Sequence, residues 1–137
     1  MTGAETDVAR AMAEARRKFE LVGIPDPGRD ASALFLSVAE EAVGSGDTMP
    51  PDVAVAYARA VARRVAREPV SHITGRRAFW MHDFEVTPDV LDPRPDTETL
   101  VEEACAVPFR QILDLGTGSG CVLLSILYER PGARGTG

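Results

Sequence analysis

Three glycines at alternate positions, Gly116, Gly118 and Gly120, lie between two apolar segments near the end of the chain. The segment before them, 111–115, is a short apolar run of the kind expected of a strand buried in a parallel sheet. The segment after them, 121–129, has apolar residues at helical spacing and is followed by a Pro-Gly pair. A strand, a glycine turn and a helix in this order are typical of the start of a nucleotide-type α/β fold.

The spacing of the glycines limits which ligand the turn could bind. Glycine lets the backbone adopt conformations barred to other residues and approach a ligand without a Cβ clash. The helix that follows directs unpaired N–H groups and its positive end to the same place, which suits a ligand with a sugar and an anionic group. A dinucleotide fingerprint would require glycine where Cys121 stands, and a phosphate-binding P-loop would require a Gly-Lys-Ser/Thr ending that the turn lacks. Neither phosphate-binding motif fits.

The N-terminal part of the chain predicts a small helical bundle. Apolar residues recur at steps of three and four over 7–22, which predicts an amphipathic helix that ends at Gly23. Asp30 is expected to cap a second helix that the glycine-rich segment 44–47 closes, and a third helix is expected from Pro51. The stripes are narrow and rich in alanine, so the three helices must pack on one another. The residues expected to face inward are Val8, Met12, Ala15, Phe19, Val22, Ala31, Leu34, Phe35, Val38, Ala42, Ala54, Tyr57, Ala58, Val61 and Val65.

Aromatic and proline-rich segments follow the helical part. The runs 78–80 and 84–86 flank the polar pair 82–83, which predicts a short β-hairpin with that pair at its tip. The segment 88–95 holds three prolines, which a helix interior or a central strand would not tolerate. Asp96 is expected to cap a further helix. The inner residues of that helix are expected to be Leu100, Val101 and Ala104.

Composition argues against several classes of protein. The chain has 15 basic and 21 acidic residues and a formal charge of −6, which argues against direct binding of nucleic acid. No apolar run approaches the ~20 residues of a membrane span, and the N-terminus has no signal segment, so we expect a cytoplasmic protein without membrane contact. Cys105 and Cys121 have no metal-ligand spacing and are expected to be buried thiols. His72 and His82 have no partner pattern either, so we predict no metal site and no catalytic residue.

Two groups of charged residues each allow two interpretations. A basic stretch on and after the third helix is either a solvated helix end or a surface that docks an acidic partner. In the proline-rich segment, Arg94 and Asp96 either hold the loop near a ligand or pair with each other. The basic stretch comprises Arg59, Arg63, Arg64, Arg67, Arg76 and Arg77, with Glu68 as its only acidic neighbour.

The glycine turn resembles motif I of the class I S-adenosylmethionine-dependent methyltransferases. In that motif an acidic residue near the strand end precedes glycines at the second, fourth and sixth positions after it, and the turn runs beneath the methionine and ribose of the cofactor. Asp114 is the matching acidic residue here. The resemblance implies S-adenosylmethionine as the cofactor, bound by Asp114, Gly116, Thr117, Gly118, Ser119 and Gly120.

The segments 68–76, 79–86 and 91–98 together resemble the HemK-type glutamine N5-methyltransferases that modify peptide chain release factors. In those enzymes a small helical N-terminal domain, a hairpin linker and a Pro-Arg-Pro-Asp/Glu-Thr-Glu segment precede a Rossmann-like catalytic domain. The resemblance covers roughly residues 30–137 and implies an α+β chain with a release factor as its protein substrate. We also expect a monomer. The implied parts are a helical substrate-recognition domain over 1–74, a hairpin and proline-rich linker over 75–95, and an incomplete Rossmann-like S-adenosylmethionine-binding domain over 96–137.

The chain departs from this family in four ways. Asp92 stands where the family usually has an aliphatic residue, and 81–83 replaces a more apolar hairpin tip. The family's Asn-Pro-Pro-Tyr motif, which grips the target glutamine amide, is missing because the chain contains no asparagine. The second strand of the catalytic domain is expected to begin only about where the chain stops, at Gly137. We therefore expect a partial chain that offers part of a cofactor cradle and is inactive alone.

Two other functions compete with this interpretation. The chain could be a non-catalytic helical protein-binding module with a vestigial nucleotide-binding turn. The third hypothesis is a nicotinamide-dependent dehydrogenase. Cys121 and the order of the predicted elements argue against it.

Overall fold

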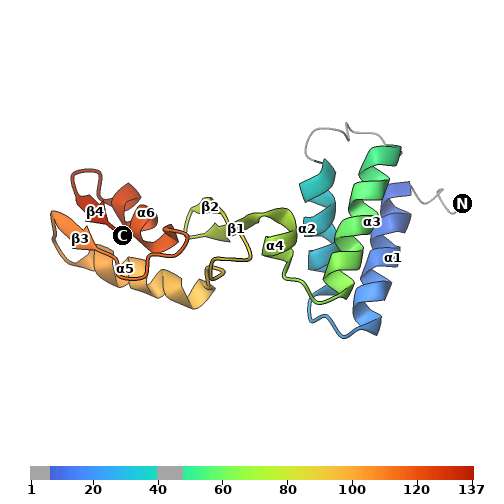
Figure 1. The fold of residues 1–137 in the computed structure, drawn as a ribbon, viewed down its shortest axis with the longest axis horizontal. Coiled ribbons are helices and arrows are strands. Elements are labelled where there is room, and N and C mark those ends of the chain that lie inside the picture. Colours follow the sequence, from blue (N-terminus) through green and yellow to red (C-terminus); the bar gives the residue numbers. More distant parts are fainter. Residues whose placement is uncertain (1–6, 40–47) are drawn as a thin grey trace, which may run out of the picture. The chain divides into compact units, whose positions relative to one another are not determined.

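The computed structural model describes residues 7–39 and 48–137, and in this part the chain is an α+β protein, as the sequence predicts (Figure 1). It divides into two compact units, one that ends at Thr74 and one from Gly75 to Gly137. The described residues of the first unit are helical, and both small sheets belong to the second unit. No helix among the described residues is long and apolar enough to cross a membrane.

Three of the helices in the first unit pack side by side around an apolar core (Figure 1). Phe19 and Leu34 are fully buried in this core, and burying a side chain of this size is worth about 1.5–3 kcal/mol. The hydroxyl of Tyr57 donates a hydrogen bond of 3.1 Å to the carbonyl of Ala31, which links the third helix to the second. The helices are α1 (Asp7–Leu21), α2 (Pro27–Ala39), α3 (Pro51–Val65) and the short α4 (Val70–Thr74).

The bundle corrects three details of the sequence prediction. Helix α2 begins at Pro27, so Asp30 lies in its first turn and does not cap it. Ala58 is exposed, whereas Val53 and Ala60 are buried, because the buried stripe of α3 is rotated from the predicted one. The five-residue helix α4 was not expected, since it is too short to show a helical period. Ala42 and the predicted stop at 44–47 lie outside the described residues.

Three arginines at the end of α3 bind within the first unit. Arg64 Nε lies 2.7 Å from Asp30 Oδ2, and Arg63 Nε donates a hydrogen bond of 2.7 Å to Glu68. Arg67, which has a φ of +72°, donates to the carbonyl of Val22 at the end of α1. Arg63 and Arg67 remain exposed, in agreement with a solvated helix end, whereas this interpretation is wrong for Arg64, which is largely buried.

The second unit opens with the predicted hairpin. Strand β1 (Arg76–Phe79) pairs antiparallel with β2 (His82–Glu85), and the last pair joins Phe79 to His82. The turn therefore consists of Trp80 and Met81, so only Met81 of the expected tip at 81–83 lies in the turn, and His82 and Asp83 belong to β2. Trp80 adopts a positive φ of 55°, which suits the tight turns of two-residue hairpins.

A proline-rich stretch leads from the hairpin to helix α5 (Glu98–Ala106) through the 3₁₀ turn η1 (Pro95–Thr97). Asp96 lies inside η1 and the N-cap of α5 is Thr97, so the predicted cap at Asp96 is wrong. Val101 is fully buried, but Leu100 is 55% exposed. The buried core of the second unit is formed by Phe79, Val101, Cys121 and Ile126.

The last elements form a parallel strand–helix–strand unit. Strand β3 (Gln111–Leu113) pairs parallel with β4 (Arg134–Thr136), and helix α6 (Cys121–Glu129) connects them. The expectation that a second strand begins about where the chain stops is confirmed, since β4 starts at Arg134, close to Gly137. Its sequence Arg-Gly-Thr lacks the apolar run that marks a buried strand. Gln111 and Leu113 are exposed, so one face of this sheet is open.

Close packing of α6 on the sheet depends on the small residue Gly135. A Cβ atom at this position would lie 2.6 Å from Leu123 Cδ1 and 2.9 Å from Leu127 Cδ1. Cys121 is buried as predicted, whereas Cys105 is only half-buried against the same core.

Candidate functional site

The backbone of the turn between β3 and α6 requires its three glycines. Gly116, Gly118 and Gly120 have φ values of +78°, +57° and +78°, a region that side chains rarely adopt. The N–H of Gly120 donates a hydrogen bond of 2.8 Å to the carbonyl of Thr117, which closes the turn. The turn is therefore a fixed loop in which three glycines expose the backbone.

Two polar atoms of the turn are buried and have no hydrogen-bond partner within the described chain, Asp114 Oδ2 and Thr117 Oγ1. An unsatisfied buried group costs about 1–3 kcal/mol, so both atoms favour a ligand that supplies the missing partners. The backbone N–H of Asp114 donates a hydrogen bond of 2.8 Å to the carbonyl of Thr136, which fixes the carboxylate at the end of the sheet.

The N-terminus of α6 meets the same turn. Gly120 is its N-cap and provides no side-chain acceptor, and the first turn holds no acidic residue. The first N–H groups of the helix, together with its positive dipole end, are therefore available to an anionic group. Ser119 is half-buried beside them. The glycine turn, its two unpaired oxygens and the start of α6 together form a polar site. The site offers both hydrogen-bond donors and hydrogen-bond acceptors.

The structure adds a neighbour that the sequence did not point to. Val90 Cγ1 lies 3.8 Å from the position that a Cβ atom would occupy on Gly118. Val90 belongs to the proline-rich segment, about thirty positions earlier in the chain. Leu115, on the other hand, is 85% exposed. Local patterns carry no signal for a contact between residues so far apart, so only the fold reveals it.

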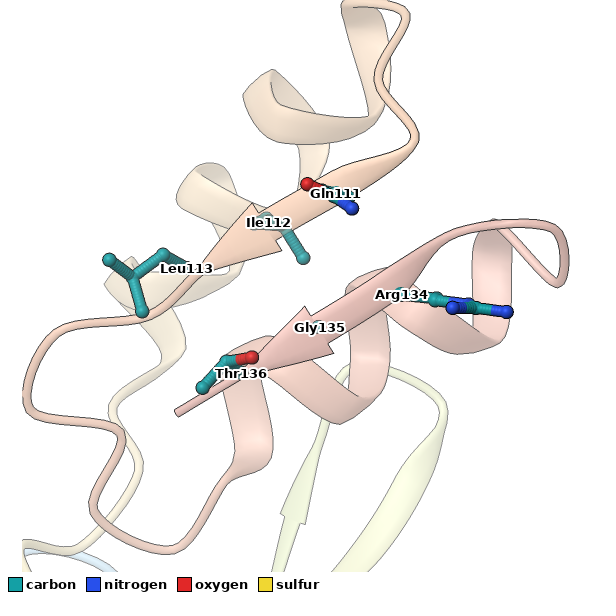
Figure 2. Close-up of a pocket in the computed structure, with 6 residues that line it drawn as sticks. All are labelled: Gln111, Ile112, Leu113, Arg134, Gly135 and Thr136. Carbon is teal, nitrogen blue, oxygen red and sulfur yellow. The ribbon is translucent and has the colours of Figure 1, made fainter.

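A hollow of about 570 Å³ lies elsewhere, over the open face of the β3–β4 sheet (Figure 2). Its only charged side chain is that of Arg134. We place the candidate site at the glycine turn instead, because the turn combines three left-handed glycines with unpaired buried polar atoms. The residues that line the hollow are Gln111, Ile112, Leu113, Arg134, Gly135 and Thr136.

The remaining candidates form no second site in the described residues. The described residues contain no group of three His, Cys, Asp or Glu side chains able to hold a metal ion. The ring of His82 packs edge-on against Tyr128 with centroids 4.3 Å apart, a structural contact. Arg94 and Asp96 are both exposed, and no ion pair joins them in the described part of the chain.

Comparison with known proteins gives consistent matches. The family described as PrmC N-terminal domain matches residues 10–75. A protein of Cereibacter sphaeroides named release factor glutamine methyltransferase is 43% identical over 132 residues, which cover 93% of this chain and 48% of the relative. The protein of the same name from Rhodospirillum rubrum is 48% identical over 128 residues, which cover 88% of this chain and 39% of the relative.

A third relative with this name, from Caulobacter vibrioides, is 39% identical over 145 residues, 95% of this chain and 48% of its own length. The chain thus spans about half the length of the curated relatives it matches, or somewhat less. The matches extend through the hairpin, the proline-rich segment and the glycine turn, beyond the region covered by the domain family alone. The chain is thus homologous to proteins named release factor glutamine methyltransferase, and its residues 10–75 match the PrmC N-terminal domain family.

Proposed function

We propose that the chain forms part of an S-adenosylmethionine-dependent enzyme that methylates the N5 atom of a glutamine side chain in peptide chain release factors. In this proposal 1–74 recognises the protein substrate, 75–95 links the two parts, and 96–137 contributes to a Rossmann-like cofactor domain. The names of the relatives support the methyltransferase and its substrate class. The parallel β3–α6–β4 unit supports a Rossmann-like fold.

The observation that carries the proposal is the pair of unpartnered buried oxygens beside three left-handed glycines. The carboxylate of Asp114 would accept hydrogen bonds from the ammonium or hydroxyl groups of the cofactor, and Thr117 would offer its hydroxyl. The N–H groups at the start of α6 would hold the carboxylate of the methionine part. These groups fit the cofactor chemically. When bound, S-adenosylmethionine supplies a methyl group on a positively charged sulfur.

Methyl transfer further requires the target nitrogen to be held in line with this methyl group, at about 3–3.5 Å. The glutamine nitrogen is a weak nucleophile because its lone pair is delocalised into the carbonyl group. Asparagine side chains that could hold this amide are absent from the 137 residues. We therefore propose that the chain alone binds cofactor without methylating a release factor.

The test is a calorimetric titration of the chain with S-adenosylmethionine and, in parallel, with NADH. We expect saturable binding of S-adenosylmethionine that Asp114→Ala weakens, and no binding of NADH. Asp83→Ala is the matched control, because Asp83 is an exposed aspartate of β2 and lies outside the turn. Absence of binding, or equal binding of NADH, would contradict the proposal. Mass spectrometry of a release factor incubated with chain and cofactor should show no added methyl group.

A further inference from the structure

The side chain of Arg77 attaches the proline-rich segment to the hairpin. Its Nε atom donates a hydrogen bond of 3.1 Å to the carbonyl of Pro93, and its Nη1 atom lies 3.9 Å from Asp92 Oδ2. The side chains of Arg77 and Asp92 are only 34% and 23% exposed, so water competes weakly for these contacts. Strand β1 thus holds the middle of the segment through one guanidinium group.

The same segment approaches the glycine turn three residues earlier, where Val90 Cγ1 lies 3.8 Å from the position that a Cβ atom would occupy on Gly118. The backbone between the two contacts is stiff. Asp92 precedes a proline, which disfavours helical backbone angles, and Pro93 has a fixed φ. A shift at the Arg77 anchor would therefore be carried along the segment towards Val90.

We propose that Arg77 is a positioning residue for the cofactor site. By holding Pro93 and Asp92 it keeps Val90 against Gly118, where the valine forms an apolar wall beside the exposed backbone of the turn. The identity of the ligand, a sulfonium nucleoside, rests on the proposed function. The mechanical link from Arg77 to Gly118 stands on the contacts alone.

The two contacts of Arg77 differ in how strongly they hold the proline-rich segment. The bond to the Pro93 carbonyl holds backbone, whereas the pair with Asp92 is long and leaves Asp92 Oδ1 buried without a partner in the described residues. Asp92→Ala removes the pair and keeps the backbone bond, so it should disturb the site less than Arg77→Ala. Arg77→Lys keeps the charge but loses the planar fork that reaches both partners, so it should give an intermediate effect.

The first experiment is a double-mutant cycle on the affinity for S-adenosylmethionine. We expect Arg77→Ala and Val90→Ala each to weaken binding about three- to tenfold, the range of one hydrogen bond or one small packing contact. The double variant should bind S-adenosylmethionine no more weakly than whichever single variant has the lower affinity, because both substitutions act through the apolar wall that Val90 forms. Arg110→Ala, an exposed arginine at the start of β3, should bind like the unaltered chain. Unchanged binding by Arg77→Ala, or fully additive losses, would overturn the inference.

Amide hydrogen exchange separates this inference from the proposed function. The N–H of Val90 donates to Thr87 at 3.2 Å, so its protection reports the order of the segment without any ligand. Arg77→Ala should accelerate exchange at Val90 and in the glycine turn, and leave exchange in the helical unit unchanged. If the unaltered chain binds no S-adenosylmethionine, the proposed function fails. Hydrogen exchange then tests the role of Arg77 by itself. Faster exchange at Val90 in Arg77→Ala supports the positioning role, and unchanged protection overturns it.

Discussion

The indole Nε1 of Trp80 donates a hydrogen bond of 2.9 Å to Oε1 of Glu129, the last residue of α6. The backbone N–H of Trp80 donates a hydrogen bond of 2.8 Å to Oε1 of Glu98, in the first turn of α5. The hairpin turn is thus tied to both helices of the second unit. The bond to Glu98 also holds Trp80 at its positive φ of 55°, a conformation that costs a non-glycine residue about 1–2 kcal/mol.

Glu98→Ala should destabilise the second unit more than Glu129→Ala. Loss of Glu98 leaves a half-buried N–H without its acceptor and removes the group that fixes the turn, at a cost of about 1–3 kcal/mol. Glu129 is exposed, so losing its bond should cost less than about 1 kcal/mol. The chain has a single tryptophan, so fluorescence during urea unfolding reports this unit. Glu102→Ala, at an exposed position of α5, is the control, and equal effects of the two test variants would contradict the expectation.

Replacing Asp30 should destabilise the helical unit. The carboxylate of Asp30 and the guanidinium of Arg64 are only 15% and 16% exposed, so Asp30→Asn leaves a largely buried cation with a weaker partner. We expect a loss of about 1–3 kcal/mol. The exposed pair of Arg16 and Glu20 is the matched control, and Glu20→Gln should cost less than about 0.5 kcal/mol. Denaturation followed by far-ultraviolet circular dichroism measures both, and equal losses would show that burial of the pair is unimportant.

The sequence predicts those elements whose signal is local and long enough. Helices α1, α3 and α6 follow from apolar periodicity, and each begins at the predicted residue. Helix α4 and strand β4 have five and three residues, too few for a period to show. The start of α2 was misplaced because Asp30 fits an N-cap by type, while its carboxylate is used by Arg64 from another helix. Tertiary contacts override the local preference there.

The sequence likewise predicts some features of the candidate site and misses others. The need for glycine at 116, 118 and 120 follows from their spacing, and the backbone has a positive φ at all three. The contacts of Val90 with Gly118 and of Arg77 with Pro93 join residues 28 and 16 positions apart, as 118 − 90 and 93 − 77 show. Arg77 looked like one member of a basic stretch, because charge along the sequence does not reveal which carbonyl a side chain reaches. The assignment of Asp114, Thr117 and Ser119 to a cofactor stays a prediction.

Gly120→Ala should destabilise the second unit and weaken the site together. The alanine would hold a φ of +78°, and its Cβ would lie 3.4 Å from Leu124 Cδ1. Left-handed backbone and this tight contact together should cost about 1–2 kcal/mol. Gly132→Ala is the matched control, since a Cβ there meets no atom within 4 Å and its φ lies outside the left-handed region. Urea unfolding followed by tryptophan fluorescence compares the two, and equal midpoints would contradict the need for glycine at 120.

Stability of the helical unit should fall at high pH because of Tyr57. Burial raises the pKa of its hydroxyl to about 12, above the ordinary value of about 10. The folded state therefore favours the neutral phenol. Its contribution is fully present below about pH 10 and is lost as the pH rises towards 12, a change of about 2–3 kcal/mol.

Tyr57→Phe tests this pH dependence. The variant should lose about 0.5–1.5 kcal/mol at neutral pH with the bond to Ala31, and its stability should then fall less steeply between about pH 10 and 12. Tyr128→Phe controls for an exposed tyrosine and should keep the full decline. Urea unfolding at several pH values, followed by circular dichroism, gives both slopes. If Tyr57→Phe declines as steeply as the unaltered chain, another group accounts for the loss of stability at high pH.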